Sequence, residues 1–369
     1  MLTELKIENF RSFEKAEFSF PPGRIIFEGG NGQGKTSILE SIYFIANLRS
    51  FRTLKPSEIC RIGTPFFRIS ARHENKGGWK SLLEVRYGEE KSFSIDHIPL
   101  GKASDFTGRM RCVTFLPDDP LLISGTSVLR RRFMDMFISL LNREYYSCLQ
   151  NYSFALRSRN FLLKNFRNRD EKEKAILDSY NSILASCGSF LVEKRKEYIK
   201  ILSEETEKVI SIIRPELANF QIRMRYNENT EKKESFRKKL ENDFFRDMQK
   251  GFTSTGPHQD ELDFLADEKS LRTYGSRGQL RTASFALKLA QYRIMNEAGK
   301  MPGSTAAENI VLVDDVLGDL DKKAREAFFR EVTGRGQIFY TFTEVPEEIK
   351  EYGFSAKWKI SSGKAVESN

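Results

Sequence analysis

The sequence predicts an α/β protein in which helices flank a core of mixed β-sheet, and an α-helical lobe is inserted between the two halves of that core. Three observations support this prediction. A glycine-rich loop joins an apolar strand to a helix near the N-terminus, and strand-like alternation of apolar and polar residues continues to about residue 112. Residues 128–214 then contain no proline and a single glycine, with apolar side chains three and four positions apart, as is typical of helices.

The glycine-rich loop fits the phosphate-binding pattern G-x-x-x-x-G-K-[ST], the P-loop or Walker A motif. Glycine allows a tight turn in which successive N–H groups point at an anion. Lys35 could then reach the β- and γ-phosphates of a nucleotide, and the Thr36 hydroxyl could ligate Mg²⁺. The residues predicted to bind the nucleotide are Gly29, Gly30, Asn31, Gly32, Gln33, Gly34, Lys35 and Thr36.

The flanks of this loop favour the motif over a chance glycine-rich turn. Residues 24–28 are a short apolar run that predicts a buried strand, and residues 36–48 have apolar groups at helical spacing. In a strand–loop–helix unit the N-terminus of the helix adds the positive end of its dipole to an anion site.

Composition narrows the class of protein. The 369 residues suffice for a large core and two lobes, and the net charge of +9 gives a mild attraction to phosphate polymers. None of the four cysteines has C-x-x-C spacing, which argues against a zinc or redox motif and favours a reducing compartment. No run approaches 18 consecutive apolar residues, and the N-terminus is too polar for a secretory signal. A cytoplasmic protein without a membrane partner is therefore expected.

Residues 310–315 read Ile-Val-Leu-Val-Asp-Asp, four apolar residues followed by two carboxylates. A buried parallel strand has such a continuous apolar run, and its carboxyl end faces the ligand crevice, which suits a Walker B strand. Asp314 is predicted to hold Mg²⁺, and Asp315 to orient the attacking water. Asp315 is one methylene shorter than the glutamate common at this position in transporter-type ATPases, so slow hydrolysis is expected. Lys35 and Asp315 are the predicted catalytic residues.

The segment Ser276-Arg277-Gly278-Gln279, here called the signature segment, precedes a run of apolar residues at helical spacing. Its position predicts that Ser276 is the N-cap of that helix. The pattern S-x-G-Q is also the signature of ABC-type ATPases, in which this helix N-terminus faces the γ-phosphate bound by another subunit. Its place after the P-loop and ahead of Asp314 strengthens that interpretation. It predicts nucleotide contacts from Ser276, Gly278 and Gln279 and an ATP-dependent homodimer.

These features predict an ABC-type P-loop ATPase head in three segments. Residues 1–125 form the first half of the ATPase lobe with Walker A, and residues 126–215 form the α-helical insertion. Residues 216–369 form the second half, with the signature segment, Walker B and a D-loop at 318–321. The charged stretch 228–239 is expected to be mobile.

Over nearly its whole length the chain resembles the RecF family of DNA repair ATPases. The segments that carry this resemblance are residues 5–13, 31–36, 49–53, 115–120, 130–135, 255–258, 276–279 and 314–317. The chain departs from the family pattern at Gln259, where arginine is usual, at Gly318, where serine is usual, and at Arg277, often glutamine. None of these departures removes a predicted phosphate or metal ligand.

The resemblance implies ATP and Mg²⁺ as cofactors and a slow, DNA-stimulated ATPase. It implies ATP-driven dimerisation on DNA at single-strand gaps or junctions with duplex. It further implies cooperation with RecR and RecO in loading RecA, with roles in DNA replication, gap repair and the SOS response. Arg11 would approach the γ-phosphate. An SMC-like or transporter-type ATPase subunit is the alternative, although the helical insertion is short for an SMC arm.

Phosphate contacts with DNA require exposed cations. The candidates are Arg49, Arg52, Arg130, Arg131 and Arg132. A second basic series is Arg157, Arg159, Lys164, Arg167 and Arg169. Because a charge series on a helix is usually only solvated, just some of these residues are expected to matter.

Overall fold

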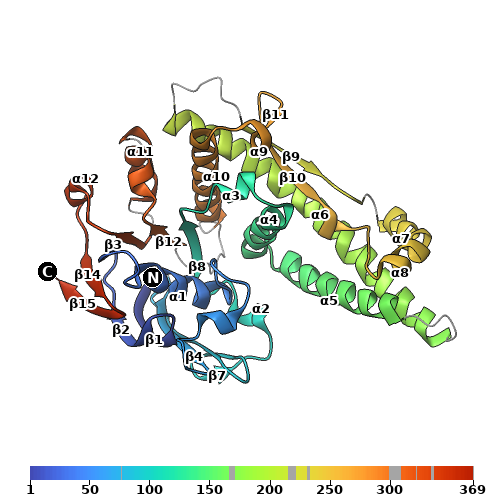
Figure 1. The fold of residues 1–369 in the computed structure, drawn as a ribbon, viewed down its shortest axis with the longest axis horizontal. Helices are drawn as coiled ribbons and strands as arrows, with labels where there is room; N and C mark the ends of the chain where they lie inside the picture. The colour runs from blue at the N-terminus through green and yellow to red at the C-terminus, as the bar shows by residue number, and fades with distance from the viewer. Residues whose placement is uncertain are drawn as a thin grey trace. The chain divides into compact units, whose positions relative to one another are not determined.

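The computed structural model describes residues 1–75, 77–165, 171–214, 222–230, 233–298, 309–320, 322–333 and 336–368 (Figure 1). The chain forms two compact units. Unit 1 comprises Met1–Asp118, Ile212–Arg214 and Lys288–Asn369, and unit 2 comprises Asp119–Ser211 and Pro215–Leu287. Unit 2 therefore extends beyond the expected insertion 126–215 and includes the signature segment.

A six-stranded sheet in unit 1 carries the predicted P-loop and Walker B strands. Its order is β15-β14-β3-β13-β12-β8, and all pairings are parallel except that of β15 with β14. The strands are β3 (Arg24–Glu28), β8 (Arg111–Phe115), β12 (Asn309–Asp314), β13 (Ile338–Phe342), β14 (Ala356–Ser361) and β15 (Lys364–Ser368). Every residue of β12 is buried, as the continuous apolar run predicts. Because β3, β13 and β12 are parallel neighbours, their carboxyl ends lie along one edge of the sheet.

An antiparallel sheet forms the second layer of unit 1, in the order β2-β1-β4-β5-β6-β7. Its strands are β1 (Leu2–Phe10), β2 (Phe13–Ser19), β4 (Phe67–Glu74), β5 (Lys80–Tyr87), β6 (Ser92–Ile95) and β7 (Ile98–Pro99). Helix α1 (Lys35–Asn47) contacts strands of both sheets. Its burial on nearly all sides follows from this position, since a helix between two layers has no free face. The remaining helices of this unit are α2 (Ala103–Phe106), α11 (Lys322–Val332) and α12 (Glu347–Glu351).

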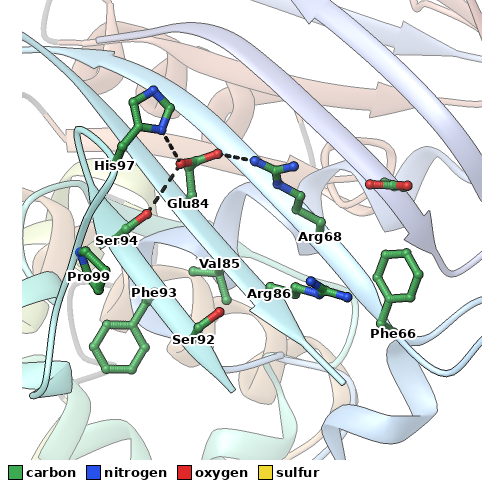
Figure 2. Close-up of a pocket in the computed structure, with 11 residues that line it drawn as sticks. Phe66, Arg68, Glu84, Val85, Arg86, Ser92, Phe93, Ser94, His97 and Pro99 are labelled. Atoms are coloured by element: carbon green, nitrogen blue, oxygen red, sulfur yellow. Dashed lines mark hydrogen bonds and ion pairs between the residues drawn. The ribbon is translucent and has the colours of Figure 1, made fainter. Parts of the chain in front are cut away.

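A polar cavity of about 460 Å³ lies on the antiparallel sheet (Figure 2). Glu84 at its centre accepts hydrogen bonds from Arg68 (2.6 Å) and Ser94 (3.4 Å) and contacts Nδ1 of His97 (3.0 Å). Partial burial opposes ionisation of Glu84, but the hydrogen bonds from Arg68 and Ser70 outweigh it and lower the pKa of the carboxyl. The carboxylate is thus satisfied by its own neighbours, and none of the predicted site residues lines this cavity.

Unit 2 contains the predicted helices. These are α3 (Leu121–Ser124), α4 (Ser127–Leu141), α5 (Arg143–Asn165), α6 (Glu171–Ile213), α7 (Lys233–Asn242), α8 (Phe244–Lys250) and α9 (Leu271–Tyr274). A small antiparallel sheet, β11-β10-β9, completes the unit, with β9 (Ile222–Asn227), β10 (Glu261–Ala266) and β11 (Lys269–Ser270). The unit boundary falls within α10 (Arg277–Ala298). Helix α6 ends two residues before Pro215, although Pro215 itself lies outside the described residues.

The charged stretch 228–239 is helical in its described second half, and its mobility stays a prediction. Residues from Lys233 onward form α7, and Phe236 and Leu240 are buried on one face of it. Two apolar residues four positions apart suffice to anchor a short amphipathic helix to a core, even where most of the neighbouring residues are charged.

Helix α6 is long and apolar enough to cross a membrane by length and composition alone, and it is the one such helix among the described residues. Its most apolar window has a mean hydropathy of 1.2 and is 39% buried. A core helix of a globular unit passes the same test. Leu184 and Leu191 of α6 are buried in unit 2.

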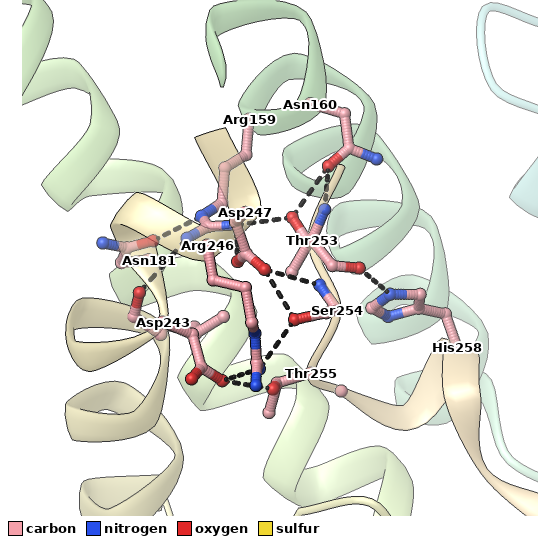
Figure 3. A network of polar contacts seen from close by, with 12 residues as sticks. Arg159, Asn160, Asn181, Asp243, Arg246, Asp247, Thr253, Ser254, Thr255 and His258 are labelled. Carbon is pink, nitrogen blue, oxygen red and sulfur yellow. Dashed lines mark hydrogen bonds and ion pairs between the residues drawn. The ribbon is translucent and has the colours of Figure 1, made fainter. Parts of the chain in front are cut away.

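A buried polar network ties α5 to the chain around residues 243–258 (Figure 3). Arg159, with no exposed surface, donates to Asp247 Oδ2 (2.8 Å), Thr253 Oγ1 (2.6 Å) and Asn181 Oδ1 (2.8 Å). Nε2 of His258 contacts the Thr253 carbonyl (2.9 Å), and burial lowers the pKa of this imidazole. His258 thus serves as a buried hydrogen-bonding residue of this segment.

Candidate nucleotide-binding site

The P-loop occupies the turn between β3 and α1, as predicted. Gly34 caps the helix with φ of +111°, a left-handed conformation that glycine adopts readily. The ammonium of Lys35 donates to the carbonyls of Gly29 (2.6 Å) and Gly30 (2.9 Å), and the residue is only 7% exposed. The predicted phosphate-binding lysine is therefore held against the loop that precedes it.

Thr36 and Asp314, 278 residues apart in the sequence, meet at the edge where β3 and β12 end. Thr36 Oγ1 donates to Asp314 Oδ1 at 2.9 Å, and Thr341 Oγ1 at the end of β13 donates to the same oxygen at 2.7 Å. Asp314 is 7% exposed. A hydroxyl and a carboxylate are oxygen ligands of the type that Mg²⁺ prefers, so this pair fits the predicted metal site. The described residues hold no cluster of three His, Cys, Asp or Glu side chains.

Asp315 differs from Asp314 in both exposure and backbone. It is exposed and has φ of +51°, a left-handed conformation uncommon outside glycine but tolerated by aspartate. The chain thus turns sharply directly after the buried carboxylate. A buried and an exposed carboxylate in succession suit the two different roles predicted for them, metal binding and water positioning.

The C-terminal hairpin of β14 and β15 braces the P-loop, which the sequence did not indicate. Gln33 accepts hydrogen bonds from Ser362 N–H at its side-chain oxygen (2.6 Å) and from Gly363 N–H at its carbonyl (3.3 Å). The hydroxyl of Thr343, just after β13, donates to Asn31 Oδ1 (3.2 Å). These partners follow the loop by more than 300 residues, so no local pattern could have shown them.

Replacing Gly34 with alanine is expected to damage the P-loop more than the same change at Gly32. Both have positive φ, which costs an alanine about 1–2 kcal/mol. A Cβ at Gly34 would also lie 2.8 Å from Ser12 Oγ and 2.9 Å from the Phe13 ring, whereas one at Gly32 meets no atom within 4 Å. Titration with a fluorescent ATP analogue should show a much larger loss of affinity for Gly34→Ala. Equal losses would contradict the role given to this contact.

The signature segment forms a capping box at the start of α10. The Gln279 N–H donates to Ser276 Oγ (3.2 Å), and the Ser276 N–H donates to Gln279 Oε1 (2.8 Å). The predicted N-cap role of Ser276 is thus confirmed. Ser276, Arg277 and Gly278 are exposed at this helix end.

Comparison with known proteins identifies the family. The chain is 31% identical to the DNA replication and repair protein RecF of Lactobacillus johnsonii, over 96% of this chain and 97% of that protein. It is 32% identical to RecF of Natranaerobius thermophilus, over 100% of this chain and 98% of the relative. This chain belongs to the RecF family. Residues 4–106 of this RecF-family chain also match the family model described as AAA domain.

Solved structures agree with this assignment and confirm the predicted ABC-type head. The structure described as the recombination mediator protein RecF-ATP in the RecFOR pathway matches with a TM-score of 0.89 and 26% identity, covering 100% of this chain and 97% of that one. An Smc head domain from Pyrococcus furiosus matches with a TM-score of 0.55 and 15% identity, covering 100% of this chain and 96% of that chain. The second likeness shows the fold alone.

In this RecF-family chain, Arg11 is held by a carboxylate of α1. Its guanidinium donates to both oxygens of the buried Glu40, at 2.8 and 2.6 Å, and to the Glu58 carbonyl at 2.7 Å. Arg52 lies 3.6 Å from the same carboxylate but is exposed, as is Arg49. A γ-phosphate would have to compete with Glu40 for Arg11, whereas Arg49 and Arg52 stay accessible.

The prediction that Arg130 contacts DNA is wrong, because this side chain is buried. Arg130 is 1% exposed, and its guanidinium donates to Glu261 Oε2 (3.0 Å) and the Gly125 carbonyl (2.6 Å). It lies on the same face of α4 as the buried Phe133 and Phe137, so it cannot reach a phosphate. Arg131 is half-buried and donates to the Asp260 carbonyl (2.7 Å), and Arg132 is half-buried.

Arg159 in the second basic series is likewise a buried structural residue of the network described above. Arg157 and Lys164 of the same series are exposed on α5, while Arg167 and Arg169 lie outside the described residues. One charged series thus divides into residues with different roles according to the face of the helix they occupy.

Proposed function

We propose that this RecF-family chain is an ATP-dependent DNA-binding protein of recombinational repair. It binds ATP with Mg²⁺, dimerises on DNA at single-strand gaps or junctions, and hydrolyses ATP slowly with stimulation by DNA. The observation that carries the proposal is the contact of Thr36 with Asp314 beside a complete P-loop. A phosphate cradle next to a hydroxyl and a buried carboxylate suits a nucleoside triphosphate with its cation.

In this proposal each residue of the site has a distinct role. The backbone of residues 29–34 surrounds the phosphates, and Lys35 leaves the carbonyls of Gly29 and Gly30 to pair with the β- and γ-phosphates. Thr36 and Asp314 hold the Mg²⁺, with Thr341 fixing the orientation of the carboxylate. When bound, the cation neutralises charge on the phosphate oxygens. Asp315 would orient the water, and its short side chain would make turnover slow.

The homodimer follows from the signature segment. We propose that Ser276, Gly278 and Gln279 meet the γ-phosphate of a nucleotide held by a second copy of the chain, where the N-terminus of α10 favours negative charge. Ser276 and Gln279 bond to each other in the single chain, so both would exchange this contact for the phosphate. Gly318 offers no hydroxyl for a contact across the dimer.

The biological context is proposed from the relatives. Their description as DNA replication and repair proteins, and a solved relative described as part of the RecFOR pathway, support partnership with RecR and RecO and an indirect role in loading RecA. A cytoplasmic location and a role in the SOS response belong to the same proposal.

Sedimentation with Mg²⁺-ATP and gapped DNA tests the proposed dimer. Ser276→Arg should bind a fluorescent ATP analogue with nearly wild-type affinity but remain a monomer, because the added bulk lies at the proposed interface. Ser276→Ala is the matched control, since it loses the same cap, at a cost of about 1 kcal/mol, without adding bulk. It should dimerise. Dimerisation of Ser276→Arg with ATP would refute the shared nucleotide site.

A further inference from the structure

Helix α5 presents aromatic and basic side chains on one exposed face. Phe154, Arg157, Phe161 and Lys164, here called the α5 stripe, are spaced three, four and three residues apart, which aligns them along a helix. The two phenylalanines are 56% and 68% exposed. The opposite face contains the buried Tyr152, Ala155, Arg159 and Leu163. Phe154 makes an edge-to-face contact with Tyr180 of α6, with 6.4 Å between the ring centres, and the stripe otherwise lies on the exposed side of α5.

The two cations of the stripe have no ion-pair partner among the described residues. Arg237, another exposed cation of unit 2, in contrast pairs with Asp178 (2.9 Å). The only carboxylate in the whole of α5 is Glu144, at its first turn. A helix face that is merely solvated usually mixes both signs of charge at neighbouring turns. The α5 stripe has one sign only, with aromatic rings between the charges.

The chain after α8 continues this surface. The aliphatic part of Lys164 lies beside Gly251, because a Cβ built there would be 3.1 Å from Lys164 Cγ. The neighbouring Phe252 is 44% exposed, and the Lys250 ammonium lies 5.9 Å from the centre of its ring. The same combination of an exposed ring and a cation without a carboxylate partner thus recurs beside the stripe.

We propose that the α5 stripe, together with Lys250 and Phe252, binds single-stranded nucleic acid. Exposed rings give stacking platforms for unpaired bases, and the cations between them neutralise the phosphates. The rise of 1.5 Å per residue places Phe154 and Phe161 about 10 Å apart along the helix, so the strand would stack separate bases on them. Phenylalanine and arginine are also enriched at protein interfaces, but lysine, which supplies two of the three cations here, is depleted there, so single-stranded nucleic acid is the better match. This inference rests on the proposed function for DNA as the partner and adds where the unpaired strand binds.

The test measures binding of the full chain, with Mg²⁺-ATP, to a fluorescent 30-nucleotide oligo-dT and to a gapped duplex. Phe154→Ala/Phe161→Ala should weaken oligo-dT binding about tenfold or more, given the stacking contribution per base. Arg157→Glu/Lys164→Glu should also weaken oligo-dT binding. The slope of the logarithm of affinity against the logarithm of salt concentration should become shallower, by the contribution of about one or more phosphate contacts. Trp79→Ala, which removes one ring, and Lys200→Glu, which reverses one charge, are controls at other exposed positions and should bind like wild type.

The outcomes separate this inference from the proposed function. If wild type binds the gapped duplex and both double variants, folded by circular dichroism, bind oligo-dT like wild type, the inference is overturned and the proposed function stands. The inference is also overturned if the variants lose only the binding of a protein partner. If wild type binds no DNA at all while binding ATP, the proposed function itself fails. Selective loss of oligo-dT binding in both double variants supports the inference.

Discussion

Replacing Lys35 with alanine is expected to reduce ATP affinity at least about 100-fold and to abolish ATP-dependent dimerisation. The ammonium is held against the P-loop by two carbonyls, so it is already located where a triphosphate would bind. Hydrogen bonds to charged groups contribute about 1.5–3 kcal/mol each, and Lys35 is expected to make contacts with both the β- and the γ-phosphate. Titration with a fluorescent ATP analogue and sedimentation with ATP measure the two effects.

Lys359→Ala is the control for that loss. Lys359 is an exposed lysine on β14, the strand next to β3, so its removal changes the net charge equally without touching the loop. ATP affinity should stay close to that of wild type. If both variants lose affinity to the same degree, the effect comes from net charge and the role assigned to Lys35 is wrong.

Asp247→Ala is expected to destabilise unit 2 by about 3–5 kcal/mol, because it leaves a buried charge without its partner. Asp247 and Arg159 have no exposed surface and lie 2.8 Å apart. The Asp247 carboxylate also accepts from the N–H of Ser254 (3.0 Å) and from its hydroxyl (2.6 Å), so both of these donors lose an acceptor. A lower urea midpoint by circular dichroism, with faster hydrogen exchange in α5 and α8, would report the loss.

Asp178→Ala provides the matched comparison. Its pair with Arg237 also joins two parts of unit 2 at 2.9 Å, but both side chains are about half exposed. Solvent already screens such a pair, so the urea midpoint should change little. Similar shifts of the urea midpoint for the two variants would show that burial does not determine how much the Arg159–Asp247 pair contributes to the free energy of unfolding.

Local patterns in the sequence predicted the parts of the nucleotide site that are continuous in the chain. The P-loop between β3 and α1, the Walker B run in β12 and the cap at Ser276 all depend on residue type and spacing within about ten residues. A glycine with a left-handed backbone at a helix start and a fully buried strand can both be recognised from the residue types within about ten positions. The helices between residues 127 and 213 were predictable for the same reason.

The partners of these parts were not predictable. Thr341 beside Asp314 and the β14–β15 hairpin beside Gln33 depend on the order of strands in the sheet, which brings distant segments to one edge. Glu40 as the partner of Arg11 depends on the packing of α1 between two sheets. No periodicity in the sequence encodes these contacts.

The sequence by itself determined the family, the α/β class and the chemistry of the loop, because these depend on residue types in a fixed local order. Only the tertiary structure decided which of its many cations are available to a ligand. Arg130 and Arg159 look like their neighbours in the sequence, yet both lie in the core of unit 2, while Arg157 is exposed. Successive residues of a helix point about 100° apart, so burial of one face separates a structural arginine from an accessible one.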